Sequence, residues 1–182
     1  MRILGNTPGS VLWLLDSGGP FADNLRRAAG QQGVDGNRLV FAPLIDLDEH
    51  LARLACADLF LDTLPYNAHT TGSDALWACV PLLTCLGTTF PGRVAASMLH
   101  AIGLPELITQ TPEQYEKLAI QLASDPERLN GLRRKLATHR SSHSLFDTSL
   151  FRAHIEAAYT RMWTLFEKGQ PPDSFAVPAL AD

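Results

Sequence analysis

Hydrophobic and polar positions along the chain predict short strands that alternate with helices. Val11 to Leu15 is an unbroken apolar run closed by polar and glycine residues, as in a buried parallel strand that feeds a turn. Similar short runs predict strands at Leu39 to Phe41, Leu59 to Leu61 and Val80 to Thr84. Helical spacing predicts helices between them, at Pro20 to Gln32, from Asp48 and from Gly72 to Ala78. This alternation indicates an α/β fold: a Rossmann-like parallel sheet with helices on both faces.

After the fourth strand the pattern becomes helical. The expected helices are Arg93 to Ile102, Pro112 to Ala123, Pro126 to Arg140, and a long last helix from Thr148 to Lys168. We therefore expect one domain over residues 1–170 that ends in a helical extension, followed by a tail at 171–182. A doubly wound nucleotide-binding domain opens with a strand and a phosphate-binding turn, but only ten residues precede Val11. The domain is thus expected to be incomplete at its N-terminus.

Composition and charge narrow the classes of function. The 182 residues are 46% hydrophobic and 19% charged, which fits one globular domain, and the net charge of −4 argues against nucleic-acid or anionic-membrane partners. No apolar run approaches the ~18 residues that cross a bilayer. The three cysteines form no CxxC pair and lie in apolar runs, so we expect buried thiols and a cytoplasmic protein. Trp13, Trp77 and Trp163 lie on apolar faces and are expected in the core.

The most informative segment is LDTLPYNAHTTGSDALW, residues 61–77. It predicts a strand end, a loop and a helix whose first turn carries His69, Thr70 and Thr71. A helix N-terminus binds anions through its free N–H groups and its dipole, Gly72 would allow close backbone approach, and Asp74 is placed to accept from ribose hydroxyls. The same residues are also an ordinary capping cluster. Ligands in α/β sheets bind beyond the carboxyl ends of strands, and this position favours the binding site.

A longer stretch carries a resemblance to a known family. DLFLDTLPYNAHTTGSDALWACVPLLT, followed by GTTFPGRVAAS, resembles the signature of the protein O-linked GlcNAc transferases, which have the two-domain glycosyltransferase B fold. The similarity runs from PGSVLWLL near the start to GQPPD near the end. It implies the donor-binding half of an inverting enzyme that transfers GlcNAc from UDP-GlcNAc to Ser or Thr of proteins, with no cofactor and no metal.

The resemblance also implies roles for individual residues. His69, Thr70 and Thr71 match residues that bind the donor pyrophosphate and stabilise the departing diphosphate, and Asp74 matches the acid at the ribose. His50 and Arg53 match a His and an Arg near the uracil, although an isolated pair at this spacing is more often a solvated helix face. No general base is identified.

One position departs from the family pattern. Better-known members carry a lysine against the nucleotide where this chain has Leu47, which cannot donate a hydrogen bond. A backbone contact from Ile45 to uracil does not depend on the side chain and is still expected. Arg93 is placed either to contact phosphate or, more simply, to serve a structural role. The remaining histidines show no metal-ligand spacing, so no zinc site is expected.

The family's acceptor-binding regions lie upstream of the matched segment. We therefore expect this chain to bind a UDP-sugar weakly and not to catalyse transfer alone, with the acceptor protein held by upstream regions. Two alternatives stay open: a related UDP-sugar enzyme, such as a UDP-glucose-dependent protein glucosyltransferase or an epimerase, and a non-catalytic nucleotide-binding or interaction module. Helical repeats of about 34 residues encoded upstream would favour the transferase.

Overall fold

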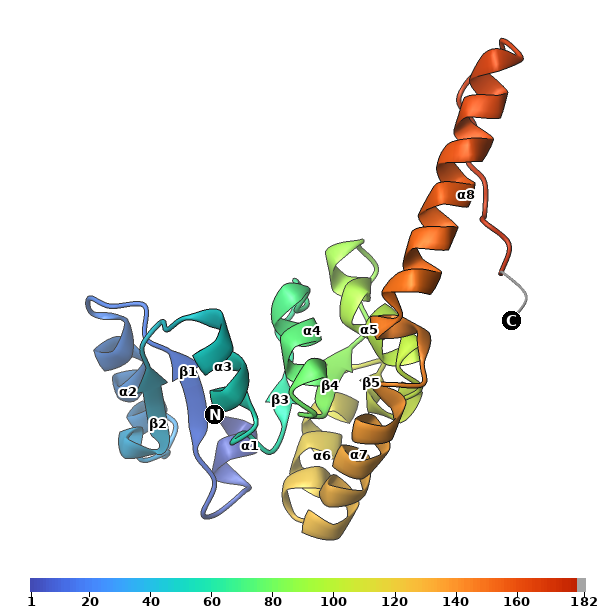
Figure 1. The fold of residues 1–182 in the computed structure, drawn as a ribbon. Helices are drawn as coiled ribbons and strands as arrows, with labels where there is room; N and C mark the ends of the chain where they lie inside the picture. Colours follow the sequence, from blue (N-terminus) through green and yellow to red (C-terminus); the bar gives the residue numbers. More distant parts are fainter. Residues whose placement is uncertain (180–182) are drawn as a thin grey trace.

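The computed structural model describes residues 1–179, in which parallel strands are surrounded by helices (Figure 1). The strands are β1 (Leu12–Leu15), β2 (Leu39–Ala42), β3 (Phe60–Leu61), β4 (Leu82–Cys85) and β5 (Ile108–Thr109). The helices are α1 (Arg2–Gly5), α2 (Phe21–Gln31), α3 (Leu47–Leu54), α4 (Thr70–Trp77), α5 (Val94–Ala101), α6 (Pro112–Ala123), α7 (Pro126–His139) and α8 (Thr148–Glu167). The expected α/β class is confirmed.

The parallel strands form two hydrogen-bonded sheets and not the single sheet expected. β1 pairs with β2, from Leu12 opposite Leu39 to Leu15 opposite Ala42. β3, β4 and β5 form the second sheet, in that order. Figure 1 places the sheets next to each other, with β1 on the side that faces β3. Among residues 1–179, β1 and β3 therefore each have a strand neighbour on one side only.

Alternate residues of β4 pack into two layers, as a strand's side-chain alternation requires. Leu82 belongs to the large core cluster that includes Leu76 of α4 and Leu99 of α5. Leu83 and Cys85 belong to a second cluster with Tyr115 and Ala119 of α6. The helices α4 and α5 thus cover one face of the sheet, and α6 covers the other.

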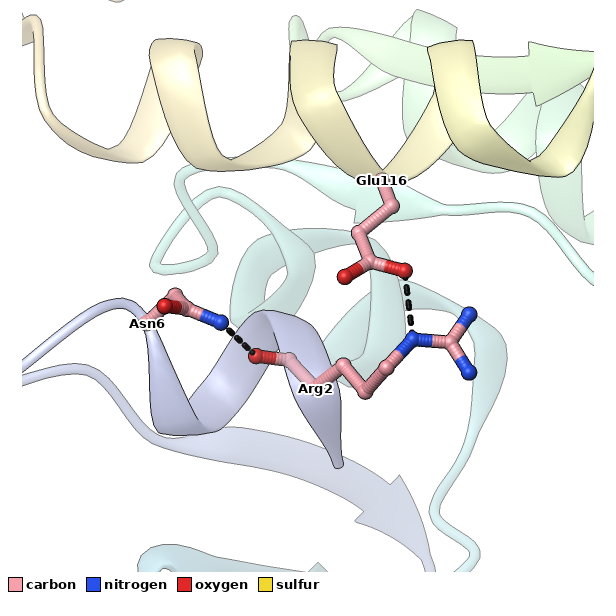
Figure 2. A network of polar contacts seen from close by, with 3 residues as sticks. All are labelled: Arg2, Asn6 and Glu116. Carbon is pink, nitrogen blue, oxygen red and sulfur yellow. Dashed lines mark hydrogen bonds and ion pairs between the residues drawn. The ribbon is translucent and has the colours of Figure 1, made fainter.

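The short helix α1 lies where the two sheets adjoin. Its Leu4 packs in a cluster with α2 and β2, whereas Ile3 packs against the cluster of β4 and α6. Figure 2 shows the polar part of this junction: Arg2 donates from Nε to Glu116 of α6 at 2.6 Å, and Asn6 donates to the Arg2 carbonyl at 2.9 Å. Arg2 is exposed, so this ion pair contributes at most ~1 kcal/mol, and apolar burial holds α1 in place.

Helix α8 projects away from the rest of the molecule (Figure 1). None of its residues is buried, and its apolar side chains, including Trp163 at 60% exposed, face solvent. The expectation of a core position is wrong for Trp163 and for Trp77, which is also exposed. Residues 171–179 form no helix or strand, and the last three positions of the expected tail lie outside the described residues. Within 1–179, no helix is both long and apolar enough to cross a membrane.

Candidate functional site

The N-terminus of α4 follows the loop that leaves the carboxyl end of β3. The helix begins at Thr70, two residues earlier than expected, with His69 in the N-cap position and without a capping bond from the His69 side chain. The first helical bond runs from the Ser73 N–H to the His69 carbonyl, at 3.0 Å. Thr70 and Thr71 are exposed and lie inside the first turn, not in the capping position. The capping alternative does not describe this helix start, because no side-chain oxygen occupies the N-cap position.

His69 is held between two aromatic rings. Its imidazole stacks on Tyr66 with ring centroids 5.0 Å apart and meets Phe90 edge-on at 6.2 Å. The Nε2 atom of His69 is buried and has no hydrogen-bond partner. A buried polar atom left unpaired costs ~1–3 kcal/mol and is expected to have a partner. An imidazole nitrogen that reaches no protein group is suited to a polar ligand at the helix start.

The loop before His69 is closed by hydrogen bonds of its own. Asp62, at the end of β3, accepts from the Thr63 N–H at 2.8 Å and from the Ala68 N–H at 2.6 Å. Thr63 donates to the Tyr66 carbonyl at 2.7 Å, and Asn67 donates to the Thr63 carbonyl at 2.9 Å. Burial raises the pKa of the Asp62 carboxyl, and its hydrogen bonds oppose that rise.

Gly72 is required by core packing. It is buried, and a Cβ atom there would lie 2.8 Å from Met98 Cε, 3.0 Å from Leu82 Cδ1 and 3.2 Å from Ala68 Cβ. The absence of a side chain lets the first turn of α4 pack closely against β4 and α5. Packing therefore accounts for the glycine, and the expected approach of its backbone to a ligand stays a prediction.

The second group of expected site residues lies on and before α3. This helix contacts α4, so the two groups are brought to the same part of the molecule. Arg53 donates to the Pro43 carbonyl at 2.9 Å, lies 3.4 Å from Nδ1 of His50, and places its guanidinium 5.3 Å from the Trp13 ring centroid. These contacts, together with a buried and unpartnered Nε, distinguish Arg53 from a freely solvated helix residue.

The remaining candidates lie around these two groups. Ile45 and Asp74 are half-buried, while Leu47 is 61% exposed at the first position of α3. Asp46, and not Asp48, occupies the N-cap position of this helix. Arg93 is exposed and occupies the N-cap position of α5. Hydrophobic Leu47 therefore stands at the surface beside the candidate uracil residues.

Sequence reasoning missed three residues of this site. Asp62, Tyr66 and Phe90 contact the loop or the imidazole. The signal available in the sequence was Tyr66, which stands close before the HTTG string, whereas Phe90 is distant in sequence. The cysteine expectation is confirmed only for Cys85, since Cys56 is exposed and Cys79 is half-buried. Across residues 1–179, no group of three or more His, Cys, Asp or Glu side chains is arranged to hold a metal ion.

Sequence comparisons identify a family and relatives that this chain resembles. The model of the family described as Glycosyl transferase family 41 matches residues 1–155. The chain is 36% identical over 173 residues to the UDP-N-acetylglucosamine–peptide N-acetylglucosaminyltransferase of Caenorhabditis elegans, covering 95% of this chain and 15% of that protein. It is 38% identical over 177 residues to the probable enzyme of the same name, SEC, of Arabidopsis thaliana, covering 97% of this chain and 18% of that protein.

A solved structure extends the comparison to the fold. A mutant of the Thermobaculum terrenum O-GlcNAc transferase superposes with a TM-score of 0.83 at 38% identity. The match covers 89% of this chain and 32% of that chain. The similarity therefore includes nearly all the elements described above and a minor part of each relative.

Proposed function

Because this chain belongs to glycosyl transferase family 41, we propose that it forms the donor-binding part of an enzyme that transfers GlcNAc from UDP-GlcNAc to Ser or Thr hydroxyls of proteins. The observation that carries the proposal is the start of α4. An uncapped helix N-terminus lies there beside two exposed threonine hydroxyls and an imidazole with an unpaired buried nitrogen. The chain spans less than a fifth of the length of either curated relative, so the activity of the whole protein is part of the proposal.

The chemistry of transfer needs a group that accepts negative charge. When the acceptor hydroxyl attacks the anomeric carbon, the bond to the diphosphate breaks and charge develops on the departing phosphate oxygens. Free N–H groups, Thr70, Thr71 and His69 would stabilise this charge, since oriented donors are worth more where water is excluded. Attack from the face opposite the leaving group inverts the anomeric carbon. No metal ion is needed in this scheme, and EDTA is expected to leave UDP binding unchanged.

The nucleoside would lie across α3 and α4. Asp74 is assigned to the ribose hydroxyls, and His50, Arg53 and the backbone of Ile45 to the uracil. Arg53 supports this assignment because its hydrogen bond to Pro43 ties α3 to the segment that leads to Ile45. Leu47 offers apolar contact where better-known members of the family carry a lysine.

The topology supports a domain that lacks one strand. The strands of a doubly wound sheet, numbered along the chain, lie side by side in the order 3-2-1-4-5-6. Here β1 and β2 would correspond to strands 2 and 3 of that fold, and β3, β4 and β5 to strands 4, 5 and 6. Strand 1 would lie between β1 and β3, where the two sheets are not paired. Residues 1–170 are therefore proposed as an N-terminally incomplete domain that binds UDP weakly and does not transfer sugar alone. Its free cysteines suit a cytoplasmic protein.

Calorimetric titration with UDP tests the proposal. We expect the chain to bind UDP and Thr71→Val to weaken binding about tenfold, because a lost hydrogen bond to a charged group costs ~1.5 kcal/mol. Thr138→Val is the matched control, since the Thr138 hydroxyl bonds only to Arg134 of its own helix. Absence of binding, or equal affinities of the two variants, would contradict the site. Titration with UDP-GlcNAc and UDP-glucose compares the donors, and robust transfer to a peptide by this chain would refute the proposed incompleteness.

A further inference from the structure

Asp62 is a buried carboxylate at the start of the loop that leads to His69. The residue is 4% exposed, and its backbone extends the ladder of β3 by donating to the Leu83 carbonyl at 3.0 Å. Its own carbonyl accepts from the Tyr115 hydroxyl at 2.9 Å. No ion pair joins it to a cation within residues 1–179. Its charged form is therefore favoured mainly by hydrogen bonds, with a smaller electrostatic contribution from His69.

The two carboxylate oxygens connect the loop to the sheet. Oδ1 accepts from both ends of the loop, the Thr63 and Ala68 N–H groups. Oδ2 accepts from the Thr84 hydroxyl of β4 at 2.6 Å, and the Thr84 carbonyl accepts from the Thr109 hydroxyl of β5 at 2.9 Å. Since charge-assisted hydrogen bonds are the strong ones, the loop is fixed to a chain of bonds that crosses β4 and β5.

Burial fixes only the end of this loop, where Asn67 and Ala68 are buried. Residues 63–66 are exposed, so apolar packing does little to select their conformation. The Ala68 N–H is the last backbone donor before His69 and is bonded to Asp62. A change in that bond would move His69, which occupies the N-cap position of α4.

We propose that Asp62 is a positioning residue, which sets the loop Thr63–Ala68 and through it the place of His69 at the donor diphosphate. The proposal rests on the proposed function, since it describes how the diphosphate site is held. Asp62 does not touch the donor. Its contribution is an acceptor that keeps the loop closed while the imidazole and the first turn of α4 face the ligand.

The test compares two substitutions of Asp62 by calorimetric titration with UDP. Asp62→Ala removes the acceptor for both N–H groups and is expected to weaken UDP binding at least about tenfold. Asp62→Asn keeps an oxygen at Oδ1 and is expected to stay within about threefold of the wild type. Val34→Ala, in the separate buried cluster of α1, α2 and β2, is the control for lost stability in a cluster that includes no residue of the loop and should also stay within about threefold.

A second readout does not depend on UDP. In NMR spectra of the unliganded chain, Asp62→Ala should shift the Ala68 amide and the His69 ring signals, whereas Val34→Ala should leave both in place. If the wild-type chain binds no UDP but these shifts occur, the proposed function is rejected and the positioning role is kept. Unchanged signals, or UDP binding by Asp62→Ala equal to that of Val34→Ala, would overturn the positioning role.

A milder variant covers the case in which Asp62→Ala does not fold. Thr84→Val removes only the donor to Oδ2, and Thr84→Ser retains it. We expect Thr84→Val to shift the His69 signals and weaken UDP binding, and Thr84→Ser to behave as the wild type. Equal behaviour of the two Thr84 variants would overturn the role.

Discussion

At the scale of single residues, the candidate site depends on a glycine, Gly72, as well as on its polar side chains. Gly72 lies in the first turn of α4 between two threonines and the core, and its lack of a Cβ allows the helix start to approach Met98 and Leu82. The exposed side of the same turn carries the hydroxyl groups. The first turn of α4 thus has a packed side at Gly72 and an exposed side at Thr70 and Thr71.

The close packing at Gly72 leads to a stability prediction. Gly72→Ala should lower the free energy of unfolding by ~1–3 kcal/mol, because the added methyl group displaces packed atoms. Gly131→Ala is the control, since a Cβ there meets nothing within 4 Å and should stabilise α7 by ~0.4–1 kcal/mol. Urea unfolding of both variants checks this. Equal changes in stability would show that the core contact at Gly72 is absent.

The buried carboxyl of Asp62 leads to a pH prediction. Burial raises the pKa of Asp62 above its ordinary 3.8, so the folded chain holds this proton more tightly than the unfolded chain. The stability that protonation contributes is full below pH 3.8 and is lost as the pH rises through the raised pKa. Relative to Asp62→Asn, the wild type should therefore lose stability from pH 3.8 upward. Urea unfolding of both proteins at a series of pH values measures the difference in their free energies of unfolding. A wild type that gains stability relative to Asp62→Asn as the pH rises would contradict the prediction.

At the scale of elements, helix starts were predictable where a capping residue and a proline stand together. Thr111 and Asp125 accept bonds from Gln114 and Arg128 and are each followed by proline, and both helices lie where expected. The start of α4 was misplaced because no side-chain cap marks it. The two-residue strand β5 was also missed.

Helix α8 was predicted correctly in extent and incorrectly in environment. An apolar helical pattern indicates a buried face, but the partner for that face is not encoded in the pattern. Phe166 is 70% exposed and Trp163 is 60% exposed, and their ring centroids lie 5.5 Å apart.

The exposure of α8 gives a prediction for its largest side chain. Trp163→Ser should change the free energy of unfolding by less than ~0.5 kcal/mol, because it removes no buried contact. Leu136→Ala, a fully buried residue of α7, should cost ~2–5 kcal/mol. Chemical denaturation of the two variants checks the contrast. A cost above ~2 kcal/mol at Trp163 would mean that α8 is packed in solution.

At the scale of the whole molecule, the residues of the candidate site were predictable to the extent that they are contiguous. His69 to Asp74 form one string, so their nearness to one helix start followed from local sequence, although that start was expected two residues too late. The contacts of Asp62 with Thr84 and of His69 with Phe90 join residues about twenty positions apart, and only the fold brings them together. The division of the strands into two sheets was likewise not encoded in any single segment.

The unpaired strand edges give a prediction for backbone dynamics. Amides of β1 and β3 should exchange with solvent much faster than those of β4, which is paired on both sides. Hydrogen exchange measured residue by residue checks this. Protection of β1 equal to that of β4 would show that β1 has a second strand neighbour in solution.

The central claim is that the start of α4 binds the diphosphate of a UDP-sugar. The most direct test is an NMR titration of the chain, with amide signals followed as UDP or uridine is added. The account predicts that UDP shifts the amides of Thr70, Thr71 and Gly72 together with the His69 ring, and that uridine does not. The same shifts with uridine, or UDP shifts confined to another part of the chain, would contradict it.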